Sequence, residues 1–599
     1  MNYWSGVNAT ASMTFDGTAT GLGLADLMLG NARTFAQGTV YGFYNRQYYN
    51  ALYAQDTWKA NRRLTLNYGL RWEPYQAPSS KWGQIHFFDA KLFDQGYRSP
   101  VYTNAPPGVI FPGDPNYVCG KSYACGKWLN FFPRVGLAFD PKGDGKMTIR
   151  ASYGVQGDRT HMFFPNQMSF GPPFANRVSL SGTTFLDPWT NFAGVPGYSA
   201  AGKNPMPAFE GIVGIGSSSK EAPFPTAGYY VNTVENMDKD FKQMYVHLWN
   251  LSIQRQFGAW LVSANYVGNS TIHLNTSTTA NPAEFLGLGP CMLNVVQANG
   301  TVGPQNFPTC STTTNEQMRR VLYRKNPLTG QFYANIAQSL NGGTASYNGF
   351  YVSVNKALTH GVSMLTNYTF SHCISDPYDQ QTSGNGLTPP GNRRAYRGNC
   401  TVGNADVRHY FTLNMVVNTP KFSNSTLQTV LGNWQIAPIL ALKSGNFLSI
   451  LSGTDRALTT AAGQTANQVS PDVYSPNKGK ACVNVVPCVE FLNKNAFEIP
   501  ALGTYGNMRY GTVEGPGLIQ LNMAISRTFG LGEKRTLQLR GEAFNLPNHM
   551  NPLILTPNLA VNSAQFGRVT ADQGGISSQV AGATSGGYRV IQLALKLAF

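Results

Sequence analysis

Apolar and polar residues alternate with a period of two in several segments of about ten residues. The clearest segment is 64–73, whose two faces carry Leu64, Leu66, Tyr68, Leu70 and Trp72 against Thr65, Asn67, Gly69, Arg71 and Glu73. Residues 134–140, 147–153, 519–526 and 591–599 alternate in the same way. One face of each segment suits lipid and the other suits water, and a tilted strand of this length crosses a bilayer.

Short and long connections take turns between these segments. The short ones are 59–63, 140–146, 257–259, 358–361 and 529–534, and the long polar ones are 74–129, 158–242, 269–347, 371–408, 444–517 and 545–588. Bacterial barrels have short periplasmic turns and long external loops. We therefore predict an all-β fold: one antiparallel transmembrane β-barrel domain over residues 1–599, with about fourteen strands, the first within 31–44. The alternation of turns places Phe599 at the periplasmic rim.

Composition excludes two other classes of protein. Charged residues make up only 12% of the chain, and no run of 18 apolar residues is present, so a helical membrane protein is excluded. The net charge is +16, but the basic residues are scattered, with pairs such as Arg62-Arg63 in place of longer runs. We therefore expect no nucleic-acid partner. A polar lumen and loops that attract anions explain the positive charge.

The cysteines are even in number and fall in segments that we interpret as loops: Cys119, Cys125, Cys291, Cys310, Cys373, Cys400, Cys482 and Cys488. This pattern indicates an oxidising compartment. Close spacing favours disulfides between 119 and 125 and between 482 and 488, and then between 291 and 310 and between 373 and 400. Eight cysteines allow 105 connectivities, so spacing gives only a preference.

Motifs for catalysis or cofactor binding are missing from the sequence. The eight histidines are dispersed, with no H-E-x-x-H and no C-x-x-C. There is no G-x-S-x-G elbow and no P-loop. We expect no enzyme activity, no metal and no cofactor.

Charged residues on the face turned away from lipid are candidates for the lumen: Arg71, Glu73, Arg134, Asp140, Arg150, Arg540, Glu542 and Lys596. They could set charge selectivity, because lumen substitutions tune what passes through a barrel. They could equally form ion pairs that hold the wall and pack a plug. The sequence leaves both interpretations open.

Six stretches spread over nearly the whole chain carry a further pattern. They are Phe15–Gly30, Tyr53–Trp58 (YAQDTW), Arg63–Glu73, Pro133–Asp140, Asn433–Gln435 with Ser444-Gly445, and Arg540–His549 (RGEAFNLPNH). Together they resemble the barrel of Oar-like TonB-dependent transporters. The strings Y-A-Q-D-x-W and R-x-E-A-F-N are specific in combination, although either one alone is a weak signal.

The resemblance implies a barrel of 22 strands in the outer membrane, surrounded by lipid. It also implies uptake of an unidentified external ligand, energised by the TonB system through a plug. The terminal Phe599 resembles the signal that the barrel-assembly machinery recognises. Residues 1–6 lack the features of a signal peptide, so we expect the C-terminal, barrel-forming part of such a protein, with no plug domain. A barrel with missing strands would expose two unpaired edges to lipid.

Two other functions stay open at this stage. A passive porin-like channel would need a closed barrel and no plug. A surface adhesion or structural protein would use its loops to bind a matrix, and nothing would cross. A plug encoded directly upstream would favour the transporter.

Overall fold

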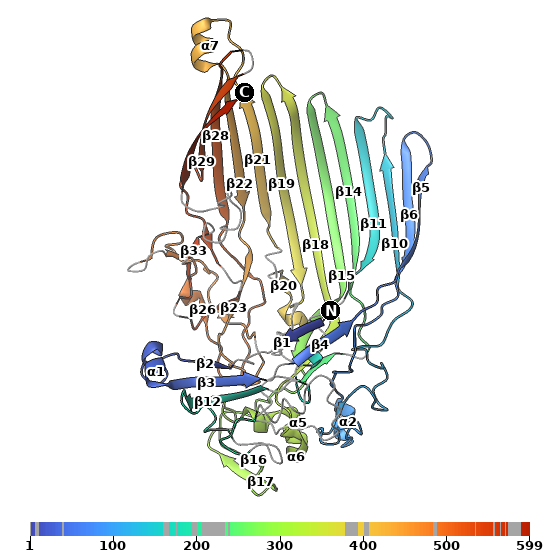
Figure 1. Ribbon diagram of the computed structural model, residues 1–599, viewed down its shortest axis with the longest axis vertical. Coiled ribbons are helices and arrows are strands. Elements are labelled where there is room, and N and C mark those ends of the chain that lie inside the picture. The colour runs from blue at the N-terminus through green and yellow to red at the C-terminus, as the bar shows by residue number, and fades with distance from the viewer. Residues whose placement is uncertain are drawn as a thin grey trace.

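The alternating segments form one antiparallel meander, which we call the wall (Figure 1). In the computed structural model, the wall consists of β5 (Leu52–Lys59), β6 (Leu64–Trp72), β10 (Phe131–Phe139), β11 (Met147–Gly157), β14 (Tyr245–Phe257), β15 (Trp260–Thr279), β18 (Ile336–Thr359), β19 (Val362–Ser375), β21 (His409–Asn418), β22 (Trp434–Lys443), β28 (Leu518–Gly530), β29 (Thr536–Phe544) and β34 (Val590–Ala598). Among the described residues, β5 pairs only with β6, and β34 only with β29. The sheet is therefore open along two edges.

The structure describes residues 2–5, 11–38, 41–159, 167–169, 171–174, 177–192, 200–205, 224, 234–237, 240–377, 393–400, 406–461, 463–482, 488–532, 535–554, 558–563, 565–569, 571–572 and 589–599. The α-helices in these ranges are α1 (Gly23–Leu29), α2 (Ala90–Asp94), α5 (Val321–Lys325), α6 (Pro327–Gly330) and α7 (Ser425–Leu431). No helix within these ranges is long and apolar enough to cross a bilayer.

Strand register gives the wall one apolar face. Leu66 lies opposite Leu137, Leu137 opposite Ala151, and Ala151 opposite Leu251. Directly opposed residues project to the same side of a sheet, so these side chains form a continuous row. Large apolar side chains on this side stay exposed, as Leu251 does at 44% and Leu595 at 68%. We call this side the outer face and the opposite side the inner face.

The two ends of the wall differ. Tight turns join adjacent strands at one end, where α7 and the C-terminus also lie, and the long connections gather at the other end (Figure 1). We call these the turn end and the loop end. At the turn end, Ala598 pairs with Thr536, close to the connection between β28 and β29. Phe599 therefore ends at the turn end, as the alternation of turns predicts.

Residues 31–44 do not contribute the wall strand that the sequence suggested. They lie in β3 (Asn31–Gly38) and β4 (Tyr41–Arg46), which belong to two small separate sheets. The ring of Phe35 packs edge-on against Trp189, with ring centroids 5.0 Å apart. The apolar side chains of β3 therefore pack against the loops and not against lipid, and the wall holds thirteen strands among the described residues.

The wall also extends further than the sequence indicated. Residues 269–279 and 336–347 were expected in a long loop, but β15 and β18 continue through them, with Thr276 opposite Leu340 and Thr278 opposite Gln338. These extensions carry polar side chains on both faces because they lie beyond the apolar band. Alternation therefore predicts only the part of a strand that faces lipid.

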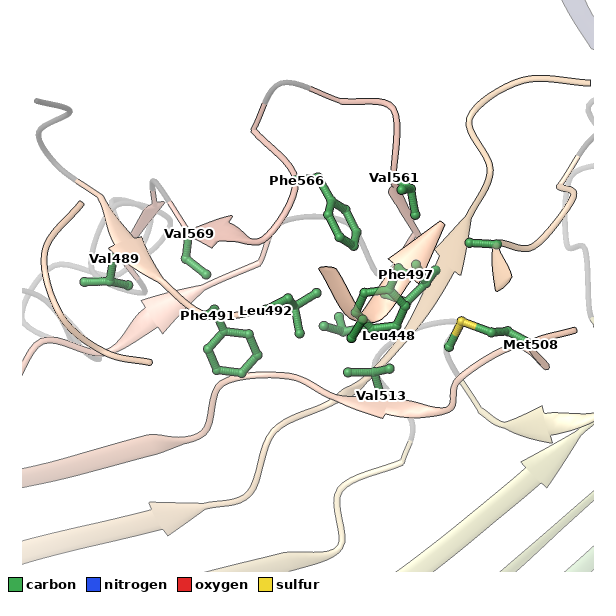
Figure 2. Packing of buried hydrophobic residues seen from close by; sticks show 13 residues of the cluster. Leu448, Val489, Phe491, Leu492, Phe497, Met508, Val513, Val561, Phe566 and Val569 are labelled. Atoms are coloured by element: carbon green, nitrogen blue, oxygen red, sulfur yellow. The ribbon is translucent and has the colours of Figure 1, made fainter. Parts of the chain in front are cut away.

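The long connections are folded and pack into apolar cores of their own, although their overall composition is polar. One core contains Phe88, Phe93, Phe111 and Tyr333, contributed by connections far apart in the sequence. A second core lies between residues 448 and 569, where Phe491, Leu492, Phe497 and Val513 converge (Figure 2). Apolar side chains are thus buried in the loops and exposed on the wall. This distribution fits loops in water and a wall in lipid.

Short strands and helical turns support this loop layer. They include β1 (Asn2–Ser5), β2 (Ser12–Thr14), β7 (Ser79–Ser80), β8 (Phe87–Phe88), β9 (Val109–Ile110), β12 (Arg177–Thr184), β13 (Val234–Met237), β16 (Cys291–Val296), β17 (Val302–Phe307), β20 (Gly398–Asn399), β23 (Phe447–Leu451), β24 (Asn467–Gln468), β25 (Val489–Glu490), β26 (Phe497–Glu498), β27 (Val513–Glu514), β30 (Pro552–Leu553), β31 (Asn558–Ala560), β32 (Arg568–Val569) and β33 (Ala571–Asp572). The buried Arg319 guanidinium joins two loops, donating to the backbone carbonyls of Leu458, at 2.8 Å, and of Thr312, at 2.9 Å.

Candidate functional site

A cavity of about 710 Å³ lies on the inner face of the wall, over β5, β6, β10, β11 and β14. Its polar lining residues include Gln55, Asn67, Ser152, Gln156 and Asn250. Three of the predicted lumen charges, Arg71, Glu73 and Arg134, also line it. The inner face therefore offers a polar site that the apolar outer face does not.

Strand register explains why these charges come together. Asn67 lies opposite Gly136, Gly136 opposite Ser152, and Ser152 opposite Asn250. Arg71, Arg134 and Arg150 are each an even number of residues from a member of this row, so their side chains project to the inner face. The sequence assigned all three to this face from alternation alone.

Glu73 is the centre of a buried network just beyond the end of β6. Its carboxylate accepts hydrogen bonds from Arg71 Nε and from the Tyr49 hydroxyl, both at 2.7 Å. The backbone N–H of Glu73 donates to the carbonyl of Asn130 at 3.0 Å, and the Asn130 amide donates to Gln243 at 2.7 Å. Every charge in this network has a partner. It therefore holds β6 against the strands beside it and is not free to bind a ligand.

Burial raises the pKa of Tyr49, and its hydrogen bond to the Glu73 carboxylate raises it further. The Tyr49 hydroxyl therefore remains protonated at neutral pH and continues to donate to Glu73. The guanidinium of Arg159 lies 4.2 Å from the centre of the Tyr49 ring, within cation–π distance.

Arg134 differs from Arg71. Among the described residues, the Arg134 side chain has no ion pair and no hydrogen bond, although it lines the same cavity. Arg150, two rows nearer the turn end, also lacks such a partner in the described part of the chain. An unpaired guanidinium in a polar cavity offers up to five donors to a carboxylate or a phosphate.

The remaining predicted charges lie elsewhere on the wall. Arg540 Nε donates to Glu542 at 2.9 Å on the inner face of β29. Lys596, on the same face of β34, is exposed and lies opposite Gln538. Neither group lines the cavity. The structure thus contains both kinds of group that the sequence left open, wall-holding pairs and unpaired cations.

Asp140 is not on the wall, contrary to the prediction. It follows the last residue of β10 and accepts hydrogen bonds from the backbone N–H groups of Lys142, Gly143 and Gly145. These hydrogen bonds, that from Gly145 first, lower the pKa of the Asp140 carboxyl. The strand ends at Phe139. The alternating pattern extended the prediction to Asp140, because an Asp that accepts hydrogen bonds in a turn also fits the next polar position of the pattern.

All eight cysteines are paired, at Cα–Cα distances of 4.8 Å for Cys119–Cys125, 5.2 Å for Cys291–Cys310, 5.4 Å for Cys373–Cys400 and 5.3 Å for Cys482–Cys488. These are the pairs that spacing favoured. Three lie within the long loops, and Cys373–Cys400 joins the loop end of β19 to the loop that follows. The disulfides therefore restrain the loop layer and not the middle of the wall.

Sequence reasoning missed the residues that complete the Glu73 network. Tyr49 precedes β5, Asn130 precedes β10, and Gln243 precedes β14. None belongs to an alternating segment, and only the pairing of distant strands brings them to Glu73. The one local signal that they share is a polar side chain one to three residues before a wall strand.

The sequence profile described as "Outer membrane beta barrel domain" matches residues 1–592. The chain belongs to this family of outer-membrane β-barrel domains. The protein is therefore located in the bacterial outer membrane, where its outer face contacts lipid. The all-β, antiparallel fold predicted from alternation is confirmed.

No curated protein sequence matches the chain. Similar solved structures include the outer membrane transporter YddB from Escherichia coli, at 11% identity and a TM-score of 0.35, covering 94% of this chain and 52% of that one. The siderophore receptor PirA from Pseudomonas aeruginosa is 10% identical, with a TM-score of 0.30 and coverages of 94% and 54%. The copper transporter OprC is 8% identical, with a TM-score of 0.32 and coverages of 95% and 56%. The chain thus spans about half the length of these structures.

Proposed function

We propose that this outer-membrane barrel domain is the wall of a TonB-energised transporter, and that the inner-face cavity contacts a ligand that carries negative charge. The observation that carries the proposal is the Arg134 guanidinium, which lines a polar cavity of about 710 Å³ and has no partner among the residues that the structure describes. The sequence resemblance to Oar-like transporters supports the energised mechanism.

The physical argument concerns charge. Glu73 is neutralised by Arg71 and Tyr49, so the cavity presents the net positive charge of Arg134. A bidentate hydrogen bond from a guanidinium to a carboxylate or phosphate is strong in a site that is partly shielded from water. Arg150 extends the positive charge along the inner face toward the turn end. An anionic solute would therefore meet successive cations on its way across.

The loop layer supports a receptor function. Its apolar cores and four disulfides restrain the described parts of the long connections at the loop end. A preorganised surface loses less conformational entropy on binding than a mobile one. The barrel-assembly machinery would insert the wall, with Phe599 as its recognition signal. First contact with the ligand would then occur at the loops, before it reaches Arg134.

The experiment compares three strains of the natural host: wild type, a strain lacking the gene, and a strain lacking TonB. Anionic solutes that remain in a complex growth medium are measured by mass spectrometry. We expect the same anionic compound to remain unconsumed in both mutant strains. A passive channel would be favoured if the strain lacking TonB still consumed the compound and if liposomes containing the protein leaked carboxyfluorescein. No difference in consumption among the strains would favour an adhesion or structural role.

A further inference from the structure

A second cavity, of about 540 Å³, lies at the loop end of β10, β14 and β15, next to the inner-face site, with which it shares Phe132. Its lining combines basic and apolar side chains: Lys127, Lys242, His273, Trp128, Leu129 and Tyr245. Two lysines and a histidine beside exposed apolar side chains form an amphipathic site. The transport argument makes no use of these residues.

His273 is held in position by the backbone of β15. Its φ is +59°, in the left-handed region, and the pairing of β15 with β18 skips it between Ile272 and Leu274. A non-glycine residue rarely adopts this conformation, and a bulge re-aims its side chain. The ring packs edge-on against Tyr245 at 5.5 Å, and its Nδ1 lies 3.1 Å from the carbonyl oxygen of Asn341. With Nδ1 donating to that carbonyl, Nε2 is left to contact a ligand, and it donates to a phosphate oxygen when the ring carries both protons.

The lysines give the cavity an excess of positive charge. Lys127 Nζ lies 3.7 Å from a carboxylate oxygen of Asp240 in an exposed ion pair. Within the described residues, the Lys242 ammonium has no ion pair. The residues that line the cavity thus include two ammonium groups and no carboxylate. Phosphate oxygens are suitable acceptors for Lys ammonium and imidazole N–H groups.

The rim of the cavity continues the outer face of the wall. Phe131 lies opposite Trp72, and Tyr245 lies opposite Gly157, all in the outer-face register. Leu129 is 86% exposed and Trp128 62% exposed. The rings of Tyr153, His247, Tyr245 and His273 follow one another with centroid distances of 6.0, 5.4 and 5.5 Å. Such a row of aromatic rings at the end of an apolar band is typical of the membrane–water interface.

From these contacts we infer that this cavity binds the phosphorylated headgroup of a glycolipid in the outer leaflet. The phosphate lies among Lys242, Lys127 and His273 Nε2, and the acyl chains lie along Leu129 and Phe131. Basic pockets at the edge of the apolar layer bind anionic headgroups by this combination of charge and apolar contact. The inference depends on the position of the wall in the outer membrane and not on what the barrel transports.

The test measures lipid binding by the intact protein, purified from the outer membrane in detergent, with native mass spectrometry. The probes are diphosphorylated lipid A, the same lipid after removal of its phosphates, and inorganic phosphate. We expect the Lys242→Gln variant to bind diphosphorylated lipid A about tenfold more weakly, the effect of one charge-assisted hydrogen bond. Lys146→Gln, at the turn end, is the matched control and leaves the Kd unchanged.

Two further variants separate charge from folding. His273→Asn keeps a residue that tolerates the left-handed conformation but removes the imidazole, and we expect a several-fold loss of affinity in a folded protein. Asp240→Asn frees Lys127, so binding becomes tighter.

Three results would overturn the inference: equal binding of the dephosphorylated lipid, equal Kd values for Lys242→Gln and Lys146→Gln, or inorganic phosphate binding as tightly as the lipid. The last result would assign the site to a soluble phosphate compound.

Discussion

Arg71 Nε lies 2.7 Å from a carboxylate oxygen of Glu73, two residues further along the chain at the loop end of β6. The same spacing recurs in β29, where Arg540 Nε lies 2.9 Å from Glu542. The two pairs differ in burial, since the Glu73 side chain is 5% exposed and that of Glu542 is 21% exposed. The Arg-x-Glu spacing is thus the same in both strands, and the loops packed above β6 account for the deeper burial of Glu73.

Replacing Glu73 with Gln is expected to destabilise the protein by about 2 kcal/mol, because it leaves the partly buried Arg71 guanidinium without its carboxylate partner. The value is below that of a fully buried pair, since Arg71 is partly exposed. The measurement is the thermal unfolding midpoint in detergent. Glu542→Gln, with a more exposed pair, should cost about 1 kcal/mol or less. Equal shifts for the two variants would refute the role of burial.

Leu251 and Asn250 are neighbours in β14 that project to opposite faces. Leu251→Arg puts a charge against lipid and should cost about 2–4 kcal/mol if it lies near the middle of the bilayer. Asn250→Arg puts the same charge on the polar inner face, where the cost should be small. Folding yields in lipid vesicles over a urea series measure both. The assignment of faces fails if the Asn250→Arg variant is the less stable one.

His86 gives the loop layer a predicted pH dependence. It is fully buried, neither ring nitrogen has a partner within the described ranges, and burial lowers its pKa from 6.5 to about 4. The folded state therefore keeps His86 neutral while the unfolded state gains a proton. The contribution of His86 to the free energy of unfolding is therefore fully present above pH 6.5. It falls by about 3 kcal/mol in all as the pH drops toward 4.

The measurement is the rate of proteolytic cleavage within the loops between pH 7 and 4.5. His86→Phe removes the titrating group, so its cleavage rate should change less with pH than that of the wild type. Carboxylates titrate in both proteins, and the difference between the two profiles isolates His86. Superimposable profiles would show that the His86 side chain does not control loop stability.

The disulfides are expected to stabilise the loops and not the wall. Removing the Cys291–Cys310 disulfide with two Ser substitutions should destabilise its loop by about 3 kcal/mol. Removing the Cys119–Cys125 disulfide, which closes a shorter loop, should cost about 2 kcal/mol. Limited proteolysis should cut the loop that contains β16 and β17 first, while the wall strands stay protected. Unfolding of the wall in the Cys291→Ser, Cys310→Ser variant would contradict this division.

The sequence predicted the wall well because lipid imposes a local rule. A strand between lipid and water must alternate, so Leu64–Trp72 and Val590–Ala598 could be found without knowledge of their partners. The same rule assigned Arg71, Arg134 and Arg150 to the inner face. It failed at Asp140, where a turn begins, and in the extensions of β15 and β18, where water surrounds both faces.

The loop layer could not be predicted from the sequence. Phe88 meets Tyr333, and Arg319 meets Leu458, across separations of more than a hundred residues, without any periodic pattern. The partners of Glu73 were missed for the same reason. The spacing of the cysteines was the one loop feature that carried usable information, because short separations favour local pairs.

The most direct test of the transport proposal is uptake by cells that carry Arg134 variants. Arg134→Gln should reduce consumption of the TonB-dependent anionic compound about tenfold or more, and Arg134→Lys should restore part of it by returning the charge. Lys146→Gln, which removes one positive charge at the turn end, is the control. Wild-type consumption by an Arg134→Gln variant present at normal levels in the outer membrane would contradict the proposal that this cavity contacts the ligand.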